Sequence, residues 1–198
     1  MLLFVLLLST LINLSNGYST GMSHMFLRKD MYIKEYNINE CLQNIHKIIT
    51  KKEKYCFLST VANQLPITGY PYGSVVGYCL NNEGYPVIAI SDESKNYNNI
   101  ENNNKVSILI NEQNTNKKVL FTGTISKIDN DVIDYDTYPS KETVNLKISY
   151  LKQHPNAGWI NYPKVFMYVL KDIKEIAYFE TKQKGKVSVE NYKKVFVK

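Results

Sequence analysis

The sequence predicts a mainly β domain with a few flanking helices. Its central part carries short runs of β-branched and aromatic residues, and residues that favour turns separate these runs. Sixteen of the 198 residues are tyrosine, which favours strands and suits the rims of β-structures. Only short segments place apolar residues at helical spacing. These observations favour one β-rich domain over a helical or α/β architecture.

The N-terminus reads as a leader. Residues 1–14 form an apolar stretch of signal-peptide length, which is shorter than the roughly 20 residues that span a bilayer. Ser15 and Gly17 are small residues in the positions that precede a cut after Gly17. An uncleaved anchor is the alternative. Because no second long apolar run follows, we expect no stable membrane insertion after cleavage, and a secreted or endolysosomal protein. The expected parts are a signal peptide, a leading segment and a barrel domain, over 1–17, 18–36 and 37–198.

Local patterns give the expected elements. Leu42, Ile45 and Ile48 recur at helical spacing and predict a short amphipathic helix within 39–49, with His46 at the surface. Further helical pieces are expected over 94–104, before His154-Pro155 and after Ser188. Strands are expected over 55–62, 72–80, 86–90, 106–110, 119–127, 165–170 and 174–180.

Charge and cysteine content limit the function. The net charge is +6, but the lysines are scattered and Arg28 is the only arginine, so we expect no nucleic-acid partner. Cys41, Cys56 and Cys79 lack CxxC spacing, and the latter two fall within predicted strands, where buried apolar residues are expected. An oxidising compartment permits one disulfide with one thiol left over, or a bridge between chains. With three histidines and no Ser/His/Asp set, metal cluster or P-loop, the sequence predicts no catalytic residue and no metal site.

The strand order resembles the flavin-binding split β-barrel of the pyridoxamine 5'-phosphate oxidase superfamily, and within it most nearly the CREG family of secreted proteins. The resemblance is carried by the run 69–76 and, further on, by His154-Pro155, Trp159, the link 171–176 and the closing VSVENYKKV. It implies a six-stranded split β-barrel with flanking helices. It also implies a homodimer that acts by interaction with a protein partner, which the sequence does not identify.

The same resemblance implies where FMN would bind. Ser74 on the second strand, Ser91 after the third and Lys95 beside it match positions that hold the phosphate in the family, and Lys118 lies near the position that contacts the ring edge. Active relatives carry Ser-Arg-Lys where this chain has Ser94-Lys95-Asn96, so Lys95 alone keeps a positive charge. Loss of a charge-assisted contact weakens phosphate binding roughly ten- to a hundredfold. The expectation is a degenerate flavin site.

Two alternatives remain open. With an intact flavin site, the protein would be an FMN-dependent oxidoreductase, and only then an enzyme. A haem-binding or haem-degrading relative would use His154 as the iron ligand. A His-Pro pair also ends helices, because the residue before proline is disfavoured in helical conformation, and Trp159 suits packing better than stacking on a ligand.

Overall fold

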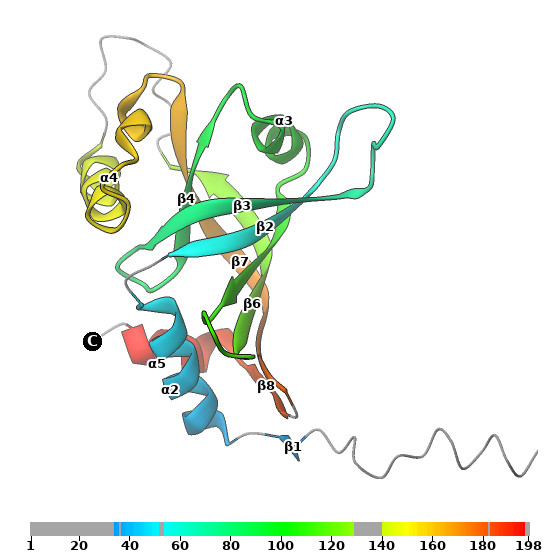
Figure 1. Cartoon of the computed structure of the whole chain (residues 1–198), viewed down its shortest axis with the longest axis vertical. Coiled ribbons are helices and arrows are strands. Elements are labelled where there is room, and N and C mark those ends of the chain that lie inside the picture. The colour runs from blue at the N-terminus through cyan, green and yellow to red at the C-terminus, as the bar shows by residue number, and fades with distance from the viewer. Residues whose placement is uncertain (1–33, 36, 52–53, 129–139, 182, 197–198) are drawn as a thin grey trace, which may run out of the picture. The chain divides into compact units, whose positions relative to one another are not determined.

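The computed structural model describes residues 34–35, 37–51, 54–128, 140–181 and 183–196 (Figure 1). The described residues of Glu35–Lys198 form one compact unit. The predicted signal peptide and nearly all of the leading segment lie outside the described residues. The compact unit contains the barrel and its helices.

Eight strands and four helices make up the described chain, together with one 3₁₀ turn. The strands are β1 (Lys34–Glu35), β2 (Tyr55–Val61), β3 (Pro71–Leu80), β4 (Pro86–Ser91), β5 (Lys105–Asn111), β6 (Lys118–Lys127), β7 (Val165–Glu180) and β8 (Gln183–Val187). The helices are α2 (Ile38–Ile49), α3 (Lys95–Asn102), α4 (Lys141–Gln153) and α5 (Val189–Phe196), and the turn η1 is Gly158–Asn161. The predicted helices are confirmed.

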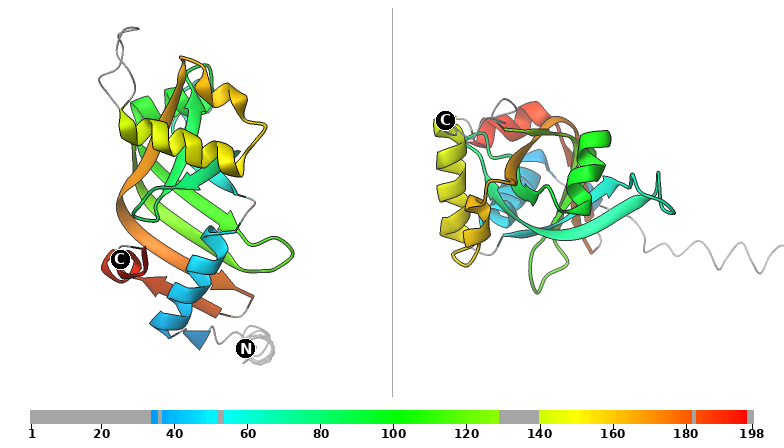
Figure 2. Two further views of the ribbon diagram at one scale, coloured as in Figure 1. Left: turned by 90° about the vertical axis from the view of Figure 1, so that its left-hand side faces the viewer. Right: turned by 90° about the horizontal axis from the view of Figure 1, so that it is seen from above.

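Six strands close into an antiparallel barrel in the order β7, β4, β3, β2, β5 and β6, with β6 pairing back onto β7 (Figure 2). The predicted six-stranded split β-barrel is therefore confirmed. Alternation along the strands builds the core: Cys56, Leu58 and Thr60 of β2 point inward and are buried, while their neighbours face outward. Strand β8 was not predicted, and it pairs antiparallel with the end of β7.

The prediction of two separate final strands is wrong, because β7 is one continuous strand of 16 residues. Its first half pairs with β4 and its second half with β8, while β6 runs along both. The change of direction falls at Asp172, whose φ is +47°, opposite a shift of register between Thr122 and Thr124 of β6. Three residues of β7 lie here opposite one residue of β6, and an irregularity of this kind bends a strand without ending it. Gly123 fits there because a Cβ would lie 2.9 Å from the Lys171 carbonyl oxygen.

The helices cover the barrel through apolar faces. Asn37 caps α2, which buries Ile45, Ile48 and Ile49 while His46 stays exposed, as predicted. Helix α5 inserts Tyr192, whose hydroxyl donates a hydrogen bond to a backbone carbonyl in the turn between β3 and β4. No helix within the described ranges is both long and apolar enough to cross a membrane.

All three cysteines are buried and free. Burial raises the pKa of the Cys56 and Cys79 thiols to about 12, so both stay protonated and act as apolar packing residues, as predicted. The described residues contain no group of three or more His, Cys, Asp or Glu side chains that could hold a metal ion.

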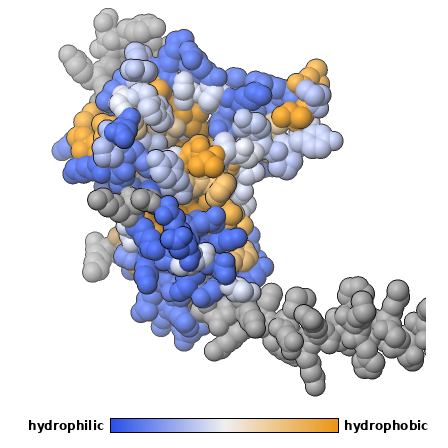
Figure 3. Space-filling model, viewed as in Figure 1, coloured by the Kyte–Doolittle hydropathy of each residue, from blue (hydrophilic) through white to orange (hydrophobic). Residues whose placement is uncertain are grey.

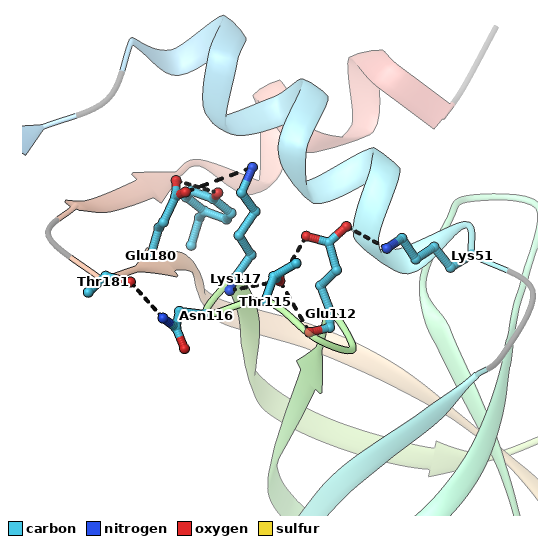
Figure 4. A network of polar contacts seen from close by, with 8 residues as sticks. Lys51, Glu112, Thr115, Asn116, Lys117, Glu180 and Thr181 are labelled. Atoms are coloured by element: carbon cyan, nitrogen blue, oxygen red, sulfur yellow. Dashed lines mark hydrogen bonds and ion pairs between the residues drawn. The ribbon is translucent and has the colours of Figure 1, made fainter.

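A polar clamp ties the end of α2 to the hairpin between β5 and β6 (Figure 4). The buried carboxylate of Glu112 pairs with the ammonium of Lys51 and accepts a hydrogen bond of 2.9 Å from the Thr115 hydroxyl. These contacts lower the pKa of Glu112. Beside it, Asn116 donates to the Thr181 hydroxyl and thereby links the hairpin to the turn after β7.

Candidate functional site at the split of the barrel

The barrel is split between β3 and β4. These strands pair at only three positions, Tyr78–Leu80 with Pro86–Ile88. The earlier residues of β3 pair with β2, and the later residues of β4 pair with β7. Helix α3 lies beside this opening and sends side chains to the inner positions of β2 and β3 (Figure 1). The candidate cofactor residues of the sequence belong to this region.

Two asparagines of α3 fill the split. The amide of Asn96 donates a hydrogen bond of 2.9 Å to the Ser74 hydroxyl. The amide of Asn99 donates to the Thr60 hydroxyl at 2.9 Å, and its carbonyl oxygen accepts from the backbone N–H of Asn63 at 2.9 Å. Asn96, Asn99 and Thr60 are all buried. Buried amides are costly unless bonded, so this network fixes α3 against the barrel.

The turn before α3 carries charges of both signs. The Ser91 hydroxyl accepts a hydrogen bond from the backbone N–H of Glu93 at 3.3 Å. The carboxylate of Asp92 lies 3.8 Å from the Lys164 ammonium. Lys95, the first residue of α3, is exposed. Two carboxylates therefore flank the place where a phosphate would meet the helix N-terminus, and they oppose the attraction that a helix N-terminus and a lysine exert on an anion.

The structure brings three of the four predicted cofactor residues to one region. Ser74 contacts α3 through its bond to the helix, and Ser91 and Lys95 flank the start of the same helix. Lys118 lies elsewhere. It begins β6, six residues before Thr124, which is the β6 residue that pairs with the first residue of β5. At about 3.3 Å per residue this separation is about 20 Å along the strand. Within one chain, Lys118 is at the opposite end of the barrel from α3.

The residues at the split fit a flavin phosphate poorly, chiefly because of their charge. The Ser74 hydroxyl accepts a hydrogen bond from Asn96 and the Ser91 hydroxyl accepts one from its own turn, so each keeps its O–H as a donor. A phosphate carries close to two negative charges, and the side chain of Asp92 stands in the same turn with one oxygen that is buried and has no hydrogen-bond partner in the described part of the chain. Proteins hold such a group with Arg, Lys and free donors. Here Lys164 faces Asp92 and Lys127 lies over the Phe166 ring, so Lys95 is the lysine for which the described residues near α3 show no such partner.

His154 is buried at the other side of β3. It follows the last residue of α4, which confirms the predicted end of that helix. Its Nε2 lies 3.1 Å from the backbone oxygen of Tyr78, and its ring packs against Tyr150 and Tyr55 at 4.5 and 5.2 Å between centroids. A nitrogen held in this way is not presented to an iron. Trp159 packs edge-on against Tyr150 at 6.4 Å, in agreement with a packing role.

Sequence reasoning missed the asparagine network. Residues 94–104 are so polar that the pattern predicts Ile100 as their main buried side chain. Asn96 and Asn99 are three residues apart and so share a helix face with Ile100, which was the available signal. A polar residue on the buried face of a helix indicates a hydrogen-bonded network, because buried polar groups need partners. The sequence does not identify those partners, since they lie on other elements that the fold brings near.

An apolar surface lies on the outer face of β2 and β3. Tyr55, Phe57 and Val75 are 59%, 49% and 62% exposed, and Phe57 and Val75 are paired across the two strands. We call these three residues the β2–β3 patch. The loop between the strands adds exposed Leu65 and Tyr70. Figure 3 shows apolar side chains gathered over these strands and at the tip of the loop. Contiguous exposed apolar surface of this kind is typical of an interaction site.

Comparison with known proteins agrees with this split β-barrel architecture. A family model described as "CREG, beta-barrel" matches residues 43–194, about three quarters of the chain. The chain therefore belongs to the CREG β-barrel family. A search of curated protein sequences returned no match.

Solved structures share the fold at low identity. A haem-binding protein from Mycobacterium smegmatis superposes with a TM-score of 0.61 at 18% identity, over 82% of this chain and 62% of that protein, so the chain spans less than two thirds of its length. The haem storage protein HutZ from Vibrio cholerae gives 0.54 at 18% identity, over 71% and 97%. A general stress protein 26 relative of the pyridoxinephosphate oxidase family, from Clostridium acetobutylicum, gives 0.54 at 12%, over 77% and 97%. Identities this low establish the fold alone.

Proposed function

We propose that this protein is a homodimeric CREG-like split-barrel protein of the secretory pathway, secreted or endolysosomal, that acts by binding a protein partner. Its flavin site is degenerate. One observation carries the proposal: the amide of Asn96 donates a hydrogen bond to the Ser74 hydroxyl, so a side chain of α3 lies against the position where the family resemblance places a phosphate contact. The helix that would cradle the cofactor is instead bonded directly to the barrel.

The second support is the β2–β3 patch. In a monomer Tyr55, Phe57 and Val75 stay exposed to water. Their burial in a dimer would contribute about 25 cal/mol of favourable free energy per Å² of apolar surface. A stable dimer buries roughly 800 Å² on each partner, so the patch needs the neighbouring strand surface as well. Strands β5 and β6 continue the same outer face with the half-buried Leu109 and Leu120. This face of the barrel is the proposed dimer interface.

The dimer is tested by the native mass in light scattering. Wild type is expected at twice the mass of one chain. Phe57→Asp places a charge in the centre of the patch and is expected to give monomers, because a desolvated, unpaired charge is costly at an interface. Ile148→Asp on α4 is the matched control, since Ile148 is also about half exposed. A monomeric wild type, or a dimer that withstands Phe57→Asp, would contradict the proposal.

The compartment is tested by expression in a secretory host. The predicted leader should be removed after Gly17, so the mature chain recovered from medium or lysosomes should begin at Tyr18. An intact N-terminus on protein that stays with the membrane fraction would favour the uncleaved anchor.

The FMN-dependent oxidoreductase remains the second candidate, supported by the exposed Lys95 at the start of α3. It makes a distinct prediction. Lys95→Ala should weaken FMN binding, whereas Lys141→Ala, which removes an exposed lysine at the start of α4, should not. Equal affinities for the two variants would remove the support for this site.

A further inference from the structure

The outer face of the barrel contains a trough that results from the strand register. Residues directly opposite one another across β3, β2, β5 and β6 form rows perpendicular to the strands. One row is large and apolar, with Val75, Phe57, Leu109 and Leu120. The next outward-facing row, two residues along each strand, is small: Gly73, Ser59, Ser107 and Thr122. The small side chains of this second row leave a hollow above the strands, and none of the four large side chains lines it.

A cavity of about 390 Å³ lies over the small row. Ser59, Ser107 and Thr122 contribute to its floor, and Val61 and Pro71 line the side towards α3. Its lining is mainly apolar. The volume falls within the range of about 300–1,000 Å³ that is usual for small-molecule sites. The cavity lies on the same outer face of β2, β5 and β6 as the proposed dimer interface.

Two lysines give this cavity its charge. Lys105, the first residue of β5, and Lys174, just after the bend of β7, both line it. Lys174 pairs with Asp172 only at 4.0 Å, and both groups are largely exposed, so the pair is weak. No ion pair involves Lys105 among the described residues. Two ammonium groups therefore stand beside an apolar hollow with hydroxyl groups in its floor.

We propose that this trough is a binding site for a small amphipathic organic anion, with a flat apolar body and one carboxylate, sulfonate or phosphate group. The apolar body lies across the small row, where it replaces water that contacts Val61 and Pro71. The anionic group meets Lys105 and Lys174, and hydroxyls such as that of Ser107 donate to it. The site adjoins the split: Thr60, the partner of Asn99, lines it, whereas no residue of α3 does.

The test uses 8-anilinonaphthalene-1-sulfonate, an aromatic sulfonate whose fluorescence rises on binding. Wild type is expected to bind one molecule per chain with a saturable curve. Ser107→Leu fills the hollow and should lower the affinity at least tenfold. Lys105→Met and Lys174→Met should each lower it about three- to tenfold, since exposed charges are screened. Lys152→Met, on exposed α4 surface, is the control and should leave it unchanged.

Further variants keep the test decisive. If Ser107→Leu fails to fold, Thr122→Leu fills the same row from β6. The neutral analogue N-phenyl-1-naphthylamine should bind more weakly and without response to the lysine variants. Phe57→Asp should keep the site, which separates this proposal from that of the dimer. Absence of saturable binding to wild type would overturn the proposal. The proposal would also be overturned if neither the leucine variants nor the lysine variants changed the affinity for the probe, because the probe would then bind elsewhere.

Discussion

The asparagines of α3 allow a quantitative test of how the split is held closed. Asn96, Asn98 and Asn99 are the same residue type on one helix, but Asn98 is exposed and the other two are buried. Replacement of each by alanine removes the same atoms. Alanine also favours the helix by about 0.5 kcal/mol, and the Asn98→Ala variant measures that gain. The difference in unfolding free energy between each buried-asparagine variant and Asn98→Ala then measures the contribution of the contacts at the split.

The magnitudes can be worked out from the hydrogen bonds. Asn99→Ala removes two bonds of 2.9 Å and leaves the backbone N–H of Asn63 without its acceptor. At about 1 kcal/mol for each bond, with up to about 1 kcal/mol for the orphaned donor, we expect a loss of about 2–3 kcal/mol. Asn96→Ala removes one bond of 2.9 Å and a weak contact of 3.4 Å to Thr60. Because the Ser74 hydroxyl is only half-buried and reaches water, the expected loss is about 1 kcal/mol.

Urea unfolding, with thermal scans as a second measurement, checks this order. In a domain of this size 1 kcal/mol corresponds to about 2–4 °C in Tm, so Asn99→Ala should melt about 4–10 °C below Asn98→Ala. Asn96→Ala should fall between them. If Asn99→Ala is no less stable than Asn98→Ala, the asparagine network does not hold α3 on the barrel. The idea that this network closes the place expected for a flavin phosphate would then be wrong.

Three further predictions concern the helix packing, the clamp and the lost cation. Gly77→Ala should cost about 1–3 kcal/mol of unfolding free energy, because its Cβ would overlap the Tyr150 hydroxyl, whereas Gly158→Ala, with open space around it, should cost little. Equal losses would refute the close packing of α4. The pKa of Glu112 is lower in the folded than in the unfolded chain, so its contribution to stability is full above the unfolded pKa, near 4.5, and is lost as pH falls through the lower folded pKa. In a profile of unfolding free energy measured from neutral pH into the acid range, Glu112→Gln should flatten the acid part. An unchanged slope would contradict the clamp. Asn96→Lys places a cation where the active relatives have one and removes the hydrogen bond from Asn96 to Ser74, so FMN affinity should rise about tenfold or more over wild type. A fluorescence titration measures this affinity. No gain would show that other groups exclude the phosphate.

The barrel could be predicted because its information is local. Runs rich in β-branched and aromatic residues at 55–62 and 119–127 predict the strands, and turn residues mark their ends. The inward face of 55–62 is not evident from its sequence, because Tyr55 and Phe57 are exposed beside buried Cys56 and Leu58. The single strand β7 could not be predicted in the same way. The run from Lys171 to Lys174 reads as a link, and only pairing with β6 on both sides of Asp172 keeps it in the sheet. Strand β8 has little apolar character and owes its place to the end of β7.

Three of the predicted cofactor residues lie near one another, and whether they bind a cofactor stays a prediction. Ser74, Ser91 and Lys95 lie at or near the start of α3 because the elements that carry them are neighbours in the fold. Lys118 is distant within one chain because β6 runs away from α3, a consequence of register that local sequence does not carry. The role of Asn96 depends on a partner 22 residues earlier in the chain, so its polarity alone favoured a surface position.

The central claim is that protein groups close the split and leave no flavin site. The most direct measurement is the visible spectrum of protein purified from a secretory host, followed by titration with FMN while flavin fluorescence is recorded. We expect colourless protein and no saturable quenching. Yellow protein with one bound flavin per chain would contradict the claim and would identify the chain as a flavoprotein.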